Sequence, residues 1–151
     1  MLMVGISPPE EGGSERVIYE LSKRIDCDVL TQKGSSCEKK IEVGIIGKGF
    51  IRNILFALRV ALKLPFISSK YDIIHIHENT LYWVAFFSDK VVLTIHGLRG
   101  FKFHDNKFLW FFFEKAINAA REVIVVSRSD EEMLERKTHY IPNGVDLTYY
   151  G

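Results

Sequence analysis

The chain has 151 residues, a length typical of one domain that buries roughly 70% of the surface of its unfolded chain. Its formal net charge of +1 favours neither a nucleic-acid partner nor an acidic one. The longest apolar runs are too short to span a bilayer, and no basic segment precedes the first of them, so we expect neither a transmembrane helix nor a signal peptide.

Strand-like and helix-like patterns alternate along the chain. Five apolar runs are rich in β-branched residues and each ends in Gly, Ser, His or Asn, which is typical of strands buried on both faces of a parallel sheet. These runs cover residues 3–7, 72–77, 91–97, 122–127 and 139–144, and two shorter strands are predicted over 27–32 and 41–46.

Helical patterns lie between most of these strands. The first helix begins near Ser14, a plausible N-cap, and the second covers 50–64, where Pro65 is expected to stop it. Further helices are predicted over 81–87, from about 107 to 120, and over 129–136. The sequence therefore predicts an α/β fold, a three-layer Rossmann-like domain with a mostly parallel sheet of about seven strands.

Polar residues gather where the predicted strands end, at the edge where open α/β sheets bind ligands. Gly12 and Gly13 lie between a strand and a helix N-terminus, where backbone N–H groups favour an anion by ~0.3–1 kcal/mol. A plain turn is the alternative for this glycine pair. Because no GxGxxG motif is present, a nicotinamide oxidoreductase is disfavoured.

Histidines mark two of these strand ends. His96 can reach into the crevice, where Gly97 leaves room beside it, although a hydrogen-bonded core histidine is the commoner fate of a single His. His75 and His77 face the same side of the sheet, but no third metal ligand adjoins them, so we expect no metal site. His77, followed by Glu78 and Asn79, is the better candidate for polar contacts with a substrate.

Five motifs follow one another along the chain, and their order is more specific than any one of them. They are Gly-Gly-Ser-Glu-Arg-Val, Asp-Ile-Ile-His-Ile-His, Thr-Ile-His-Gly, Val-Ser-Arg-Ser and Ile-Pro-Asn-Gly-Val-Asp. This order resembles the N-terminal half of retaining GT-B glycosyltransferases of family 4. The resemblance covers essentially the whole chain. It implies transfer of a hexosyl-type sugar from a nucleotide-diphosphate donor to a glycan or lipid-linked acceptor, with retention and without a cofactor or metal.

The same resemblance implies roles for individual residues. His96 would contact the transferred sugar as the catalytic residue, and the glycine pair would lie near the donor diphosphate. The remaining expected contacts would line the acceptor side. The substrate-binding residues expected on this basis are Gly12, Gly13, His77, Glu78, Asn79, Gly97 and Ser127.

The resemblance also implies a division into domains. Residues 1–151 would be the acceptor-side domain, ending at the interdomain linker, with the C-terminal donor-binding domain absent. Glu114 and Glu122 show the Glu-x7-Glu spacing of that second domain, but one lies on an aromatic helix and the other opens a strand, so the spacing is coincidental. We expect the chain to be inactive alone. The alternative is a non-catalytic module that binds a sugar or lipid headgroup, or a partner subunit.

The predicted helix over 50–64 carries a basic face. No Asp or Glu occurs from residue 44 to residue 71. Helical spacing places Arg52, Phe56, Arg59 and Lys63 on one face, with Leu55, Leu58 and Leu62 towards the sheet. The basic face predicts contact with an anionic membrane, and an ordinary solvated face is the alternative. Since Cys27 and Cys37 form no CxxC motif, we expect reduced thiols and a cytoplasmic protein. The basic face adds the expectation of a peripheral position at the inner face of the cell membrane.

The predicted helix before residue 120 is apolar on every side over residues 108–113. We expect burial of Leu109, Phe112 and Phe113. The alternative is an exposed patch that meets the absent domain, a second copy or lipid. No stacking platform on an open groove is apparent, so we expect no nucleic-acid partner.

Overall fold

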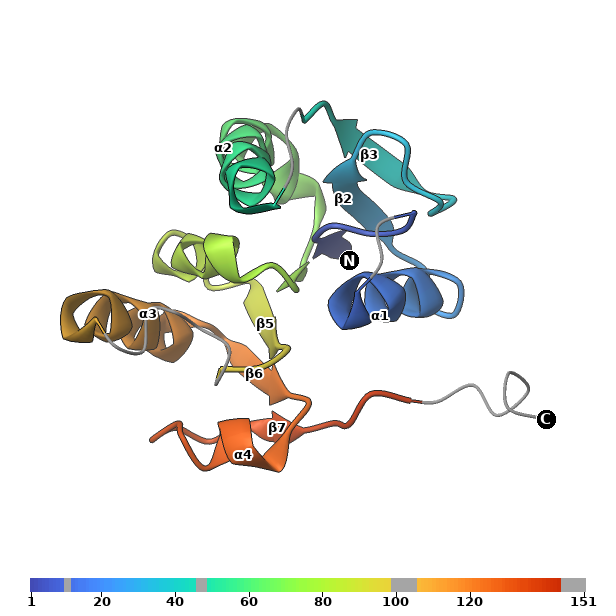
Figure 1. Ribbon diagram of the computed structural model, residues 1–151. Coiled ribbons are helices and arrows are strands. Elements are labelled where there is room, and N and C mark those ends of the chain that lie inside the picture. The colour runs from blue at the N-terminus through green and yellow to red at the C-terminus, as the bar shows by residue number, and fades with distance from the viewer. Residues whose placement is uncertain (10–11, 46–48, 99–105, 145–151) are drawn as a thin grey trace.

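The computed structural model describes residues 1–9, 12–45, 49–98 and 106–144. Within them, seven strands form one sheet in the order β3-β2-β1-β4-β5-β6-β7, and every neighbouring pair is parallel (Figure 1). The strands are β1 Leu2–Val4, β2 Asp28–Gln32, β3 Lys40–Val43, β4 Ile74–Ile76, β5 Val91–Ile95, β6 Glu122–Val125 and β7 His139–Tyr140. The prediction of a parallel sheet of about seven strands is confirmed.

Helices cover both faces of the sheet. Figure 1 shows α1 on one side of the strands, and α2 and α3 on the other. The helices are α1 Gly13–Ser22, α2 Gly49–Ile67, α3 Lys107–Ala119 and α4 Arg128–Glu131, with 3-10 helices η1 Ser68–Lys70 and η2 Asn79–Phe86. The three-layer Rossmann-like architecture is therefore confirmed.

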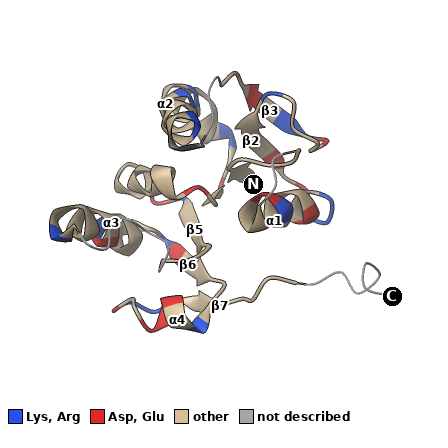
Figure 2. Cartoon of the chain, in the orientation of Figure 1, with Lys and Arg blue, Asp and Glu red and all other residues tan. Residues whose placement is uncertain are grey.

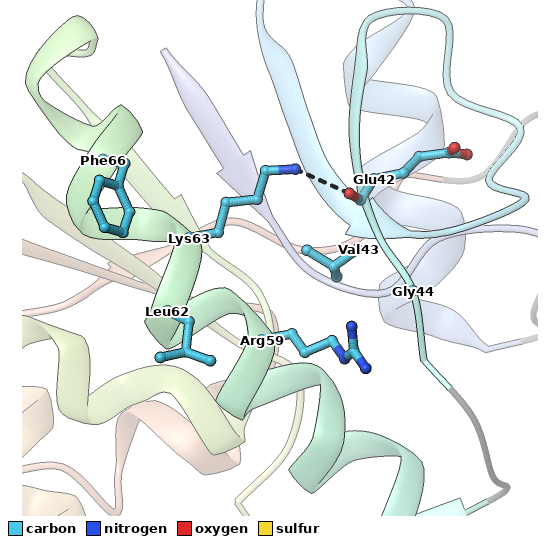
Figure 3. Close-up of a pocket in the computed structure, with 7 residues that line it drawn as sticks. All are labelled: Glu42, Val43, Gly44, Arg59, Leu62, Lys63 and Phe66. Atoms are coloured by element: carbon cyan, nitrogen blue, oxygen red, sulfur yellow. Dashed lines mark hydrogen bonds between the residues drawn. The ribbon is translucent and has the colours of Figure 1, made fainter.

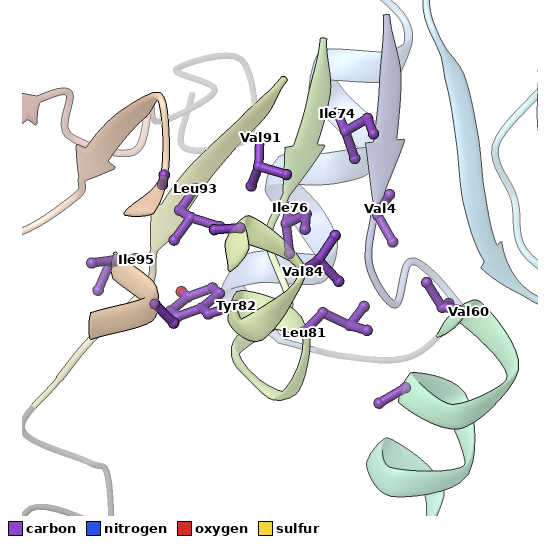
Figure 4. Packing of buried hydrophobic residues seen from close by; sticks show 14 of the residues in the cluster. Val4, Val60, Ile74, Ile76, Leu81, Tyr82, Val84, Val91, Leu93 and Ile95 are labelled. Carbon is purple, nitrogen blue, oxygen red and sulfur yellow. The ribbon is translucent and has the colours of Figure 1, made fainter. Parts of the chain in front are cut away.

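The alternation of side chains along each strand divides the core into two clusters. Leu2 and Val4 belong to the larger cluster, to which α2, η2 and α3 contribute. Figure 4 shows Val4 in this cluster with Val60 and Leu81. Met3, the middle residue of β1, points to the other face and packs with Ile18 of α1 and Val29 of β2. Because both faces of β1 are buried, the strand is apolar without interruption, as parallel sheets require.

Gly5 lets α1 lie close to the sheet. A Cβ atom at this position would lie 2.5 Å from Cδ1 of Ile18 and 3.4 Å from Cβ of His77. A larger residue at position 5 would therefore require the Ile18 side chain to move. Glycine here lets Ile18 of α1 pack directly against the backbone after β1.

Helix α2 is rotated relative to the sequence prediction. Phe56 is 0% exposed and packs in the core with Val60 and Leu64, whereas Leu62 is 74% exposed and Leu58 is also exposed. The prediction that Phe56 lies on an exposed basic face is wrong. The helix is apolar around most of its circumference, so periodicity alone does not identify the buried side.

Several predicted boundaries also differ from the structure. Helix α2 continues through Pro65 to Ile67, because a proline so near the end disturbs only the last turn. Helix α1 is capped by Gly12, and Ser14 lies in its first turn. In α3, Leu109 and Phe112 are exposed, which corrects the expectation of burial, whereas Phe113 packs against the larger core cluster. Helix α4 ends at Glu131 rather than near residue 136.

Candidate functional site

A polar cavity of ≈ 240 Å³ lies where β4 and β5 end, beside the N-terminus of α1. Parallel strands bring their carboxyl ends to one edge of the sheet, so residues far apart in the chain meet here. The cavity is lined by Ser14, Glu15, Asn53, His77, Glu78, Asn79, Tyr82, His96 and Gly97.

Two histidines from neighbouring strands form the centre of this cavity. His77 follows β4, and its backbone N–H donates to the carbonyl of Val4 at 2.9 Å. His96 follows β5, the next strand of the sheet. Nδ1 of His77 lies 3.0 Å from Nε2 of His96, so one ring donates a hydrogen bond to the other.

The second nitrogen of each ring takes no part in this hydrogen bond. Nε2 of His77 and Nδ1 of His96 are buried and have no hydrogen-bond partner among the described residues. His77 is only 5% exposed, and burial lowers the pKa of both rings below the usual value for histidine. Both rings are therefore neutral at neutral pH, and each keeps one buried nitrogen whose hydrogen-bonding capacity no described residue uses.

His75 lies on the same face of β4 but belongs to a different interaction. Its Nε2 forms a hydrogen bond of 2.7 Å with the hydroxyl of Thr94, and burial lowers its pKa to about 4. His75 is thus a buried histidine with a structural hydrogen bond. Within the described ranges, no group of three or more His, Cys, Asp or Glu side chains is placed to hold a metal ion.

Two carboxylates accompany the histidines. Glu15 comes from the first turn of α1 and accepts a hydrogen bond of 2.8 Å from the hydroxyl of Ser14. Glu78 follows His77, and burial raises the pKa of its carboxyl group, partly opposed by hydrogen bonds from Thr80 and by the charge of Arg52. Neutral imidazoles beside carboxylates form a site rich in hydrogen-bond acceptors, which suits a ligand with hydroxyl groups.

The turn after His96 is held by a residue that is distant in sequence. Gly97 has a φ of +130°, a conformation that favours glycine, and the N–H of Leu98 donates to Oδ1 of Asp130 at 2.9 Å. Asp130 is 1% exposed in the first turn of α4, where Ser127 is the N-cap. This contact ties the loop after β5 to the loop after β6.

The structure brings together His77, Glu78, Asn79, His96 and Gly97 around the cavity, as expected for a strand-end site. Gly12 and Gly13 lie at the start of α1 but are not among the residues that line the cavity, although Ser14 and Glu15 immediately after them are. Ser127 does not line the cavity, and its hydroxyl accepts a hydrogen bond from the N–H of Ser129 instead.

Sequence reasoning missed four lining residues and the support behind them. These are Ser14, Glu15, Asn53 and Tyr82, together with Asp130. Glu15 could have been found from its place after the glycine pair in the first helical turn, and Asp130 from its position three residues after the capping Ser127. Asn53 and Tyr82 carry no comparable signal, because their side chains reach the cavity only through the packing of α2 and η2.

A larger hollow of ≈ 430 Å³ lies between α2 and β3 (Figure 3). Arg59 and Lys63 stand beside Leu62 and Phe66 along it, and Nζ of Lys63 donates to the carbonyl of Glu42 at 3.0 Å. Among the described residues that line this hollow, none is a histidine and none has a buried unpartnered nitrogen of the kind found at the strand ends. The smaller cavity is therefore the better candidate for chemistry, despite its volume.

Comparison with known proteins bears on the same question. Residues 11–149 match the family model described as Glycosyltransferase Family 4, whereas no curated protein matches the chain. None of the described helices combines the length and the apolar character needed to cross a membrane. The match covers nearly the whole chain, and the parallel sheet with its strand-end cavity agrees with it. The chain therefore belongs to glycosyltransferase family 4.

Proposed function

We propose that this chain is the acceptor-side, N-terminal domain of a retaining GT-B glycosyltransferase that moves a hexosyl-type sugar from a nucleotide-diphosphate donor to an acceptor. One observation carries the proposal. His96, to which the resemblance in sequence assigns the contact with the transferred sugar, lies in a polar cavity with a buried nitrogen that no described residue engages. A sugar hydroxyl is a suitable partner for that nitrogen.

In this proposal His96 hydrogen-bonds a hydroxyl of the migrating sugar and holds it while oxocarbenium character develops. A contact that strengthens as charge develops accelerates the chemical step. His77, Glu78 and Asn79 contact the acceptor side. Gly12 and Gly13 admit the diphosphate at the start of α1, and the departing phosphate takes the acceptor proton, so the domain supplies no general base. Ser127 is left out, since it caps α4.

We assign the nucleoside and most diphosphate contacts to a separate donor-binding domain. The supporting observation is that no Lys or Arg lines the cavity among the described residues, although cations are the usual partners of a diphosphate. The domain alone should therefore bind donor weakly and transfer no sugar.

Calorimetry and NMR on the 151-residue chain test this assignment, with UDP-glucose and GDP-mannose as probes. We expect dissociation constants of about 1 mM or weaker, roughly 4 kcal/mol of binding free energy, and resonance changes at His96 and Glu78. His96→Ala should reduce those changes, whereas His139→Ala, at an exposed position on β7, should not. Micromolar binding would contradict a separate donor domain, and changes confined to other regions would contradict the site.

We also propose that the outer face of α2 contacts an anionic membrane from the cytoplasmic side. Leu58, Leu62 and Phe66 are exposed on it, the last at 81%, with Arg59 and Lys63 alongside (Figure 3). Figure 2 shows Lys and Arg on α2 and no acidic residue. Apolar side chains among cations are typical of interfacial helices. Arg52 is half-buried, and its charge acts on Glu78. Neither Arg52 nor the buried Phe56 is therefore part of the proposed membrane contact.

Co-sedimentation with phosphatidylglycerol vesicles tests the membrane contact. The chain should bind at low salt and dissociate as salt rises, because screening shortens the reach of charges to ~8 Å at physiological ionic strength. Arg59→Glu with Lys63→Glu should abolish binding, and Phe66→Ala should weaken it without changing the salt dependence. The same charge reversal on the α1 layer, Lys23→Glu with Arg24→Glu, is the matched control. Equal loss in both double variants would contradict a specific face.

A further inference from the structure

We propose that His77 and His96 act as one hydrogen-bonded unit, in which the tautomer of each ring determines that of the other, and the two nitrogens outside the shared bond offer a ligand hydroxyl one donor and one acceptor. This inference rests on the proposed function for the identity of the ligand. It adds a positioning role for His77 and a reason why the site takes a hydroxyl rather than an anion.

The geometry joins the two rings rigidly. Their facing nitrogens are 3.0 Å apart and the ring planes lie 28° from parallel. The backbone of His77 is held by its hydrogen bond to the carbonyl of Val4, and its side chain is buried. His96 is followed by the turn that Asp130 holds. Neither ring can turn without breaking the bond between them.

A count of protons gives the consequence. A neutral imidazole has one N–H and one bare nitrogen. If His77 donates from Nδ1, its Nε2 is bare and His96 must carry its proton on Nδ1. If His96 donates from Nε2, its Nδ1 is bare and His77 carries its proton on Nε2. In both cases the two rings share one tautomer. The two nitrogens outside the shared bond, Nε2 of His77 and Nδ1 of His96, are then one donor and one acceptor.

The surroundings keep the unit neutral. Both rings are buried deeply enough to disfavour the charged form. Glu15, Glu78 and Tyr82 line the same cavity, and His75 lies beside His77. Of these groups, the carboxylate of Glu15 is the one that favours a proton on His96. A hydroxyl group both donates and accepts, so it satisfies a neutral pair. The fully ionised oxygens of a diphosphate ester only accept, so they would leave the bare nitrogen without a partner.

His75 provides an internal comparison on the same strand face. Its ring centroid is 4.2 Å from that of His77, yet its Nε2 bonds the hydroxyl of Thr94. It does not compete for Nδ1 of His77. Its tautomer should therefore be independent of His77.

Nitrogen-15 NMR of the imidazole rings in the 151-residue chain tests the unit directly. We expect a scalar coupling across the hydrogen bond between Nδ1 of His77 and Nε2 of His96, and the same tautomer in both rings. His77→Asn keeps a polar atom near the Nδ1 position, whereas His77→Gln moves it towards the Nε2 position. The hydrogen-bonded shift of His96 Nε2 should persist in the first variant and disappear in the second, with His75 unchanged in both.

Two results would overturn the inference. One is the absence of coupling, with different tautomers in the wild-type rings. The other is an N–H on both His77 Nε2 and His96 Nδ1 when inorganic sulfate, an acceptor-only anion, is added at neutral pH. The wild-type coupling decides the matter even if a variant does not fold. None of these measurements requires sugar transfer. An intact coupling in a domain without any role in transfer would reject the proposed function and keep the unit.

Discussion

At the scale of single residues, Asp130 shows how a group outside the cavity determines its shape. Its buried carboxylate accepts a hydrogen bond from the N–H of Leu98, two residues after His96. The intervening Gly97 has a positive φ, and the turn that it forms places this N–H at the carboxylate. A turn held in this way fixes the direction in which the strand end presents its histidine. Asp130 is therefore a positioning residue rather than a catalytic one.

We predict that Asp130→Ala destabilises the domain by about 1–3 kcal/mol, because the buried N–H of Leu98 loses its acceptor. Asp130→Asn keeps an oxygen in place and should cost less. Urea unfolding measures both, with Glu132→Ala at an exposed position of the same segment as the control. Equal stability of the alanine variant and the wild type would show that the contact does not hold the turn.

Sequence patterns located the strand-end residues of the site but not the helical ones. His77 and His96 could be predicted because a parallel sheet always gathers its carboxyl ends, whatever the order of its strands. Asn53 of α2 and Tyr82 of η2 reach the cavity only because of the rotation of their helices. That rotation depends on packing, which a single sequence does not reveal.

At the scale of elements, α2 illustrates the same difficulty. Its apolar residues occur on several sides, so a helix could be predicted over this segment but not its buried side. The sheet selects Phe56, Val60 and Leu64 for the core and leaves Leu62 and Phe66 exposed. A segment this apolar on its outer face is more apolar than folding alone requires, which is why a contact surface is proposed there.

The rotation of α2 can be tested by stability. Phe56→Ala should lower the free energy of unfolding by about 3–5 kcal/mol, because it opens a cavity in the core. Leu62→Ala should change it by about 0.5 kcal/mol or less, as exposed positions usually do. Denaturant unfolding of both variants under the same conditions gives the comparison. A larger loss for Leu62→Ala than for Phe56→Ala would restore the rotation predicted from the sequence.

At the scale of the whole molecule, the fold could be predicted because its signals are repeated. Each strand is a continuous β-branched run, helical patterns lie between most of them, and the right-handed crossovers of parallel sheets limit the possible topologies. The order β3-β2-β1-β4-β5-β6-β7 places the loops after β1, β4 and β5 side by side. The cavity lies at those loops, so the topology explains the position of the site.

The central claim is that His96 acts on the sugar as it is transferred, and kinetics of the His96→Ala variant test it most directly. The measurement needs this domain together with the donor-binding domain that we propose. The variant should lower kcat on the order of a hundredfold with little change in the KM for the donor, since the contact strengthens in the transition state. His139→Ala should leave both constants unchanged. An unaltered kcat in His96→Ala would make His96 a packing residue and would contradict the proposed role of the cavity.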